Sequence, residues 1–292
     1  LIPWPDYLKI CYNITIMKKL NTSPISGMQE LLPEKQALFD KLKNEIARVY
    51  HSHGFMSIET PIIDRNEILL AKAGGETEKQ IYKVFKTAET ADDADQALRF
   101  DHTVPLARYV VEHENDLTFP FKVTQIGRNF RGERAQKGRF REFYQLDVDV
   151  IGRNTLNIAY DAEVVKTAYD ALKTFIKPEM KIRISNRKIL TGLLQELGLQ
   201  TKSSDIFSII DHAEKVPKEK TLEAFEEIGL NGSEIETLVK FSEINGGKEA
   251  TIKSLNSLGI KNEIFETGVK ELEGVLDLLE KQGMKDIAIG DM

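Results

Sequence analysis

The segment from Phe121 to Ile151 contains two strand-like runs joined by a turn in which positive charge is concentrated. Between Arg128 and Arg141 there are six cations and one acid, Glu133, although the whole chain carries a formal net charge of −6. Most of these cations are arginines, whose planar guanidinium pairs with two phosphate oxygens at once in a way that a lysine ammonium cannot. The segment therefore predicts a hairpin whose turn binds an anion, with a nucleotide phosphate as the first candidate. A solvated basic turn without a ligand is the plainer alternative.

Apolar and polar residues alternate in the run that follows the turn. We expect the apolar positions on one face of a strand and the polar positions on the other. The two sets are Leu146, Val148 and Val150, and Gln145, Asp147 and Asp149. An antiparallel sheet with one face on the core gives this pattern, and its polar face can simply meet water. Beside a basic turn, however, an amide and carboxylates would suit a ligand with phosphate at one end and an ammonium or imidazole at the other.

Composition sets the outer bounds. With 292 residues, of which 41% are hydrophobic and 29% charged, the chain can bury a sizeable core, and we expect a soluble, globular protein of more than one domain. The single cysteine, Cys11, excludes an internal disulfide framework. Because there is no Cys/His cluster either, a structural zinc site is not expected, and a reducing compartment such as the cytoplasm fits best.

The two ends of the chain carry separate expectations. Residues 1–16 lack the basic start, long apolar middle and cleavage site of a secretory signal, and they are too short to span a bilayer. We expect the native chain to begin at Met17 and residues 1–16 to be a non-native or disordered leader, with an authentic extra strand as the alternative. The apolar run 287–289 is followed by only three residues, so the chain is expected to be a fragment.

The remaining pattern predicts an α+β fold. A helix is expected from Pro33, with Leu38, Leu42, Ile46 and Val49 on one face, until Gly54 ends it. Short strands are expected over 55–60, 81–85 and 98–100, and a hairpin loop over 87–96. The next helix is expected after Thr103, whose hydroxyl can cap it or hold a ligand. A helix over 160–174 and a strand over 182–185 follow, and after Asn186 short helices broken by glycines predict a separate helical module with solvated Glu/Lys faces.

Three segments, in this order and spacing, resemble the histidyl-tRNA synthetases of class II. They are GMQELLPEKQALFDKLKNEIARVYHSHGFMSIETPIID, LRFDHTVPLARYV and QIGRNFRGERAQKGRFREFYQLDVDVIG. The match covers residues 24 to about 190 well, and the later region resembles the family's insertion domain more loosely. The resemblance implies a class II antiparallel sheet flanked by helices, with a catalytic core at 17–186 and a mostly helical insertion at 187–292.

The family's known motifs imply roles for individual residues. The helix ending near Gly54 and the strand into Pro61 match motif 1, which forms a homodimer interface, and the basic hairpin matches motif 2, which binds ATP. By this similarity Arg131 is the catalytic residue and contacts the α-phosphate, Glu133 lies near the adenine, and Arg139 reaches the distal phosphates.

The resemblance also implies a histidine pocket. Asp101, Thr103 and Gln145 match the positions that hold the α-ammonium group, and Asp149 matches the carboxylate that accepts a hydrogen bond from the imidazole. Many bacterial members have Glu at 101 and 149, so the reach of both groups is shorter here. Gly132 and Ala135 replace a bulkier residue and a proline in the hairpin loop.

The implied activity is that of a homodimeric, cytoplasmic histidine–tRNA ligase without membrane contact. Its substrates would be L-histidine, ATP and tRNA(His), with Mg²⁺ as cofactor and no dedicated metal-ligating residues. A histidine-specific segment of the RGLDYYTG type, motif 3 and an anticodon-binding domain are expected beyond Met292, so the 292-residue piece alone is expected to be inactive. The alternative is a synthetase-like regulatory paralogue that binds histidine without charging tRNA. A synthetase-like domain inside a larger signalling protein is the third possibility.

Overall fold

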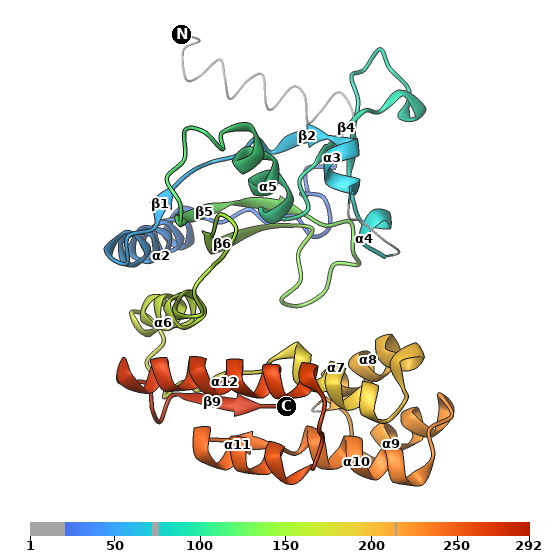
Figure 1. Ribbon diagram of the computed structural model, residues 1–292. Helices are drawn as coiled ribbons and strands as arrows, with labels where there is room; N and C mark the ends of the chain where they lie inside the picture. The colour runs from blue at the N-terminus through green and yellow to red at the C-terminus, as the bar shows by residue number, and fades with distance from the viewer. Residues whose placement is uncertain (1–20, 72–75, 214) are drawn as a thin grey trace, which may run out of the picture. The chain divides into compact units, whose positions relative to one another are not determined.

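A computed structural model of the chain describes residues 21–71, 76–213 and 215–292 (Figure 1). The chain divides into two compact units. Unit 1 comprises the residues up to Lys43, Ser57–Leu117 and Thr124–Asp147, and unit 2 comprises Asn44–Met56, Thr118–Val123 and Val148–Met292. The leader predicted at residues 1–16 lies outside the described residues, and the domain boundary predicted at residue 186 stays a prediction.

The predicted hairpin is present as β5 (Phe121–Phe130) and β6 (Glu142–Ile151), the green strands of Figure 1. A short strand, β1 (Met56–Ser57), lies on the other side of β5, so the sheet order is β1-β5-β6. Most side chains of β5 are buried, whereas every side chain of β6 is only partly buried. The predicted contrast between a buried and an exposed face of β6 is therefore wrong. Within the described residues β6 has a neighbouring strand on one side only, so its side chains are less covered than those of the central strand.

A second small sheet in unit 1 joins β2 (Ile63–Arg65), β4 (Gln96–Leu98) and β3 (Lys83–Val84) in the antiparallel order β2-β4-β3. The strand predicted over 81–85 is shorter in the structure, the one predicted over 98–100 is shifted toward the N-terminus as β4, and β2 was not predicted. Three short helical segments fill the connections, namely α3 (Asn66–Leu70), α4 (Glu76–Lys79) and η1 (Ala91–Asp93). The loop predicted at 87–96 is confirmed, apart from η1 and the first residue of β4.

The helix predicted from Pro33 is confirmed as α2 (Pro33–Ser52), and Gly54 adopts a φ of 80° just after its end. Because residues with a side chain rarely adopt such a φ, glycine suits this reversal. The predicted apolar face is covered only near its C-terminal end, where Val49 is buried, while Leu38 stays 59% exposed. The helix predicted after residue 103 is α5 (Thr103–Glu112).

Unit 2 is mainly helical, and the short helices predicted after Asn186 are present in it, but it also contains a small sheet that the sequence did not predict in full. Strand β7 (Ile182–Ile184) pairs in parallel with β9 (Ala288–Asp291), and β8 (Asn245–Gly246) pairs antiparallel with β9. The helices are α6 (Ala159–Lys173), α7 (Arg187–Glu196), η2 (Gln200–Lys202), α8 (Ser203–Ala213), α9 (Lys218–Glu227), α10 (Gly232–Ser242), α11 (Lys248–Ser257) and α12 (Glu263–Lys281).

The core of unit 2 forms where α7 packs against α12. Glycines allow this close approach, because a Cβ atom on Gly268 would lie 2.9 Å from the backbone nitrogen of Ile189, and one on Gly192 would lie 2.6 Å from that of Phe265. Leucines such as Leu193 and Leu272 then fill the interface with almost no exposed surface. Within the described residues, no helix is both long and apolar enough to cross a membrane.

Candidate active site

A cavity of about 520 Å³ opens in unit 1 beside the hairpin turn. It is lined by residues from the segment after α4, from the loop between β4 and α5, from the loop between β5 and β6, and from the start of β6. These residues are Gln80, Phe100, Arg131, Glu133, Gly138, Arg139, Phe140, Phe143 and Tyr144. The lining includes all three residues that the resemblance assigns to ATP, namely Arg131, Glu133 and Arg139.

Arg131 is held in place by two aromatic rings. Its guanidinium carbon lies 4.4 Å from the ring centroid of Phe100 and 5.0 Å from that of Phe143. The Nε atom donates to the backbone carbonyl of Phe100 at 3.3 Å, and the backbone N–H donates to Arg141 across the hairpin at 2.9 Å. Cation–π contacts of this kind restrain a guanidinium without neutralising it. The cavity therefore contains a pre-oriented positive charge.

The cations of the hairpin turn are partly compensated by acids of the same hairpin. Arg139 Nη1 lies 3.1 Å from Glu133 Oε2, and Arg128 Nη1 lies 2.9 Å from Glu142 Oε1. Arg141 donates to the backbone carbonyl of Glu133 at 3.0 Å, which fixes the loop. The charges of the turn were counted in the sequence from Arg128 to Arg141, and this range leaves out Glu142. The positive charge available to a ligand is therefore smaller than the sequence indicated.

The N-terminus of α5 is capped by Asp101 and not by Thr103, the residue that the sequence predicted. Asp101 Oδ1 accepts hydrogen bonds from the backbone N–H groups of Thr103, at 3.0 Å, and Val104, at 3.3 Å. Thr103 is the first residue of the helix and its side chain is exposed, so its predicted role as the cap is wrong. The carboxylate before the helix satisfies these N–H groups instead.

Gln145 is fixed by a residue that sequence reasoning missed. The Asn129 side-chain amide donates to Gln145 Oε1 at 2.6 Å, and Asn129 is fully buried on the neighbouring strand. The sequence around Asn129 gave no signal of this role. Asp101, Thr103 and Gln145 do not line the 520 Å³ cavity. Asp149 lies further along β6. It belongs to unit 2, because unit 1 ends at Asp147 on this strand.

Two more buried polar residues of unit 1 escaped the sequence analysis. His102 Nδ1 lies 2.8 Å from Asp147 Oδ2, and only 1% of the imidazole side chain is exposed. Arg99, also 1% exposed, donates from Nη1 to the Thr60 carbonyl at 2.7 Å and from Nε to the Arg128 carbonyl at 2.9 Å. Burial lowers the pKa of Arg99 below its ordinary value, with a smaller opposing effect of Glu59. The sequence offered one signal for Arg99, because it is a charged residue inside a strand-like run, two positions before Asp101.

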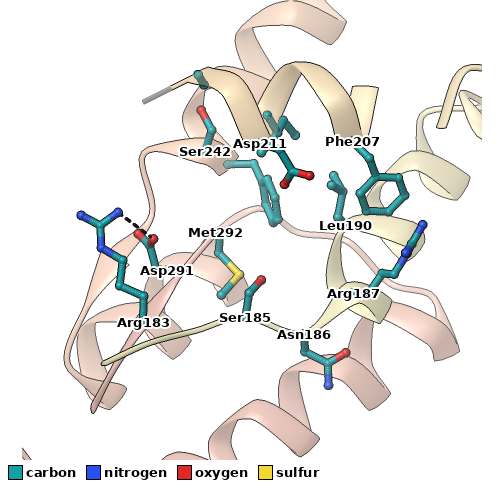
Figure 2. Close-up of a pocket in the computed structure, with 13 residues that line it drawn as sticks. Arg183, Ser185, Asn186, Arg187, Leu190, Phe207, Asp211, Ser242, Asp291 and Met292 are labelled. Carbon is teal, nitrogen blue, oxygen red and sulfur yellow. Dashed lines mark hydrogen bonds and ion pairs between the residues drawn. The ribbon is translucent and has the colours of Figure 1, made fainter. Parts of the chain in front are cut away.

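A second cavity, of about 640 Å³, lies in unit 2, and none of the predicted site residues line it. Figure 2 shows Arg183 facing Asp291, at 3.3 Å between Nη1 and Oδ2, and Arg187 beside Phe207. The guanidinium carbon of Arg187 lies 4.4 Å from the Phe207 ring centroid. This cavity has a larger volume than the one in unit 1. Because its Arg183 is already paired with Asp291, that larger volume does not make it the stronger candidate for a phosphate-binding site. Among the described residues, no group of three or more His, Cys, Asp or Glu side chains could hold a metal ion.

Comparison with known proteins places the chain among relatives of one kind. It is 43% identical over 272 residues to a histidine–tRNA ligase of Clostridium tetani, and 44% identical over 256 residues to one of Finegoldia magna. These alignments cover 92% and 88% of this chain but 61% and 58% of the two relatives, so the chain spans about three fifths of their length.

Solved structures agree with this placement. The histidyl-tRNA synthetase of Nostoc sp. PCC 7120 matches with a TM-score of 0.81 and 37% identity, over 94% of this chain and 61% of that one. An ATP phosphoribosyltransferase regulatory subunit/histidyl-tRNA synthetase of Bacillus halodurans matches with a TM-score of 0.76 at 23% identity, which shows a shared fold alone. Residues 27–290, almost the whole described chain, match the histidyl-tRNA synthetase family. The chain therefore belongs to the histidyl-tRNA synthetase family.

Proposed function

We propose that this chain is part of a class II histidine–tRNA ligase that activates L-histidine with ATP and transfers it to tRNA(His). The observation that carries the proposal is the position of Arg131, a half-buried guanidinium held between Phe100 and Phe143 in the 520 Å³ cavity. A cation restrained in this way is suited to charge that develops on a phosphoryl group.

The proposed first step joins the histidine carboxylate to the α-phosphorus of ATP. A carboxylate oxygen forms the new bond to phosphorus while the bond to the bridging oxygen breaks, and pyrophosphate leaves. Negative charge grows on the α-phosphoryl oxygens, and Arg131 stabilises it because its guanidinium is already oriented. Arg139 would exchange its partner Glu133 for the distal phosphates. The step needs no side-chain nucleophile, because holding the two substrates together supplies much of the rate.

Histidine recognition is proposed to depend on Asp101, Thr103 and Gln145 for the α-ammonium and on Asp149 for the imidazole. The hydrogen bond from Asn129 to Gln145 supports this in part, because it restrains one of the four side chains. Mg²⁺ would neutralise the departing pyrophosphate. The proposed magnesium ion would be held mainly by the nucleotide's own phosphates.

We also propose that the full-length protein is a cytoplasmic homodimer. Leu31, Leu32 and Leu38, all at the start of α2 or just before it, are exposed, and such apolar side chains are often covered by a partner. Sedimentation of the full-length protein and of a Leu38→Glu variant checks this. A monomeric wild type would contradict the proposal, and a shift of the variant toward monomer would support it.

The fold alone does not separate a ligase from a regulatory paralogue, because a protein whose name includes both possibilities shares it. The experiment is ATP–pyrophosphate exchange and tRNA aminoacylation by the full-length protein that contains this chain. The proposal predicts histidine-dependent exchange and charging of tRNA(His). Histidine binding without either activity would favour the regulatory paralogue.

A further inference from the structure

His102 occupies a position that connects two parts of the proposed histidine site. It lies between Asp101 and Thr103 at the start of α5, and its side chain is buried. Its Nδ1 atom lies 2.8 Å from the Asp147 carboxylate on β6. The two residues are 45 positions apart in the sequence, so this contact joins the loop before α5 to strand β6.

Asp147 stands two residues after Gln145 on the same strand, so both side chains lie on the same face of β6. The backbone carbonyl of Asp147 accepts a hydrogen bond from Thr124 Oγ1 at 2.8 Å, which holds this point of β6 against β5. The Asp147 side chain is still 26% exposed. Its bond to His102 therefore occupies a carboxylate that would otherwise be free to attract a cationic group of the ligand.

The surroundings of the imidazole leave it little freedom to move. Gly127 lies directly against it, since a Cβ atom there would be 3.2 Å from His102 Nε2 and 2.4 Å from Arg99 Nη2. The His102 carbonyl accepts from the Gln125 amide at 3.4 Å and from the Leu106 N–H at 2.9 Å. The loop is thus held through both its backbone and its side chain.

His102 Nε2 is buried and has no hydrogen-bond partner among the described residues. A buried polar atom without a partner is unfavourable, and an aliphatic side chain of similar size would avoid this cost. The advantage of histidine at this position must therefore come from Nδ1 and its bond to Asp147.

We propose that His102 is a positioning residue for histidine binding, which sets Asp101 and Thr103 relative to Gln145 through its hydrogen bond to Asp147. This proposal rests on the proposed function. Its effect falls on the amino acid and not on the nucleotide, because neither His102 nor Asp147 lines the cavity that contains Arg131.

The test uses two substitutions of His102 in the full-length protein. Asparagine can place its side-chain amide where the imidazole has Nδ1, so His102→Asn keeps the hydrogen bond to Asp147, whereas His102→Leu fills the space without it. We expect His102→Leu to raise the KM for L-histidine in ATP–pyrophosphate exchange by about tenfold, as for loss of one hydrogen bond to a charged group. The KM for ATP should change by less than about twofold, and His102→Asn should restore the KM for histidine to within about threefold.

Asp147→Asn tests the other partner, and its combination with His102→Leu should raise the KM for histidine no more than either change alone. Equal rises in both KM values, or no rescue by His102→Asn, would show a merely structural role and overturn the proposal. Calorimetric titration of L-histidine separates this result from failure of the proposed function. If the wild type binds histidine without catalysing exchange, the ligase proposal fails, while the same pattern of histidine affinities among the variants still decides the role of His102. A wild type that binds no histidine overturns both.

Discussion

The guanidinium carbon of Arg131 lies 4.4 Å from the ring centroid of Phe100, with Phe143 at 5.0 Å from it. Two separate segments of unit 1 therefore enclose one cation of the hairpin. The contact explains how an arginine at the base of a basic turn can stay oriented although no carboxylate of the described residues pairs with it. Its charge remains available to a phosphate, unlike that of Arg139, which is paired with Glu133.

Replacing Arg131 tests this orientation directly. We expect Arg131→Ala to lower kcat/KM in histidine-dependent ATP–pyrophosphate exchange by at least about a hundredfold, the usual cost of one donor aimed at a transition-state oxyanion. Arg131→Lys keeps the charge but loses the planar group that lies over the two rings, so it should recover only part of the loss. Near-normal exchange by Arg131→Ala would rule out the phosphate role.

Asp149 and Arg139 are expected to act on different substrates. Asp149→Ala should raise the KM for histidine far more than the KM for ATP, because a polar pocket that loses its partner for the imidazole can lose up to about 10⁴ in discrimination. Arg139→Ala should do the reverse and mainly raise the KM for ATP. Exchange kinetics with each substrate varied in turn provide the comparison, and equal effects of both changes on both substrates would refute the assignment.

The sequence predicted part of the candidate site and missed the contacts that support it. The arginines and the alternation on β6 lie within one local hairpin, so their proximity followed from short-range pattern. The pairing of His102 with Asp147 and the rings around Arg131 depend on how the β4–α5 segment folds back onto the hairpin. Such contacts are non-local and have no periodic signature. Gln145 was assigned without its partner Asn129, although both lie on the hairpin, because the pattern of each strand does not show which side chains bond across the pair.

The close packing of α7 against α12 makes a prediction about stability. Gly268→Ala would place a methyl group 2.9 Å from the Ile189 backbone nitrogen, so the helices must separate, and overpacking of this kind typically costs about 1–3 kcal/mol. Gly274→Ala in the same helix is the matched control. Its methyl group would lie 3.7 Å from Ile158, an ordinary contact, and alanine should stabilise the helix by up to about 1 kcal/mol.

Urea denaturation of both glycine variants, followed by circular dichroism, provides the comparison. A lower midpoint for Gly268→Ala and an unchanged or higher midpoint for Gly274→Ala is the expected pair of results. A similar shift for both variants would mean that glycine's flexibility, and not the helix contact, decides the outcome.

An ion-pair cluster in unit 2 predicts a dependence of stability on pH. Lys248 Nζ bonds Asp277 and lies 3.0 Å from Glu280 Oε2. The hydrogen bond from Lys248 lowers the pKa of Asp277 below its ordinary value of 3.8, so Asp277 contributes stability above that value, which is lost as the pH falls through the lowered pKa. The same contacts, with the bond to Asp277 first, raise the pKa of Lys248 above 10.5, so its contribution is lost only at strongly alkaline pH.

Lys248→Met removes the cation and should therefore lower the thermal midpoint most at about neutral pH. The difference in midpoint from the wild type should close as the pH falls below 3.8 and through the lowered pKa of Asp277. Thermal unfolding across that range measures the gap. Because the groups are close to solvent, added salt should also shrink it. A gap that stays constant down to acid pH would show that the lysine acts through packing alone.

The fold was predictable where the signals were local. Pro33 and Gly54 mark the ends of α2 by their backbone preferences, and the glycines at 198, 229, 259 and 283 end helices with positive φ values. Strand β9 was missed because the apolar run at 287–289 was read as an abrupt end. Its role depends on parallel pairing with β7, more than a hundred residues away. Long-range pairing of this kind has no signal within the strand itself.

The most direct test is a crystal structure of the full-length protein with a non-hydrolysable analogue of histidyl-adenylate. We predict that the α-phosphate lies within hydrogen-bond distance of Arg131, that the α-ammonium is held by Asp101, Thr103 and Gln145, and that the imidazole contacts Asp149. An analogue bound elsewhere, for example in the 640 Å³ cavity of unit 2, or bound with Arg131 directed away from the phosphate, would contradict the account.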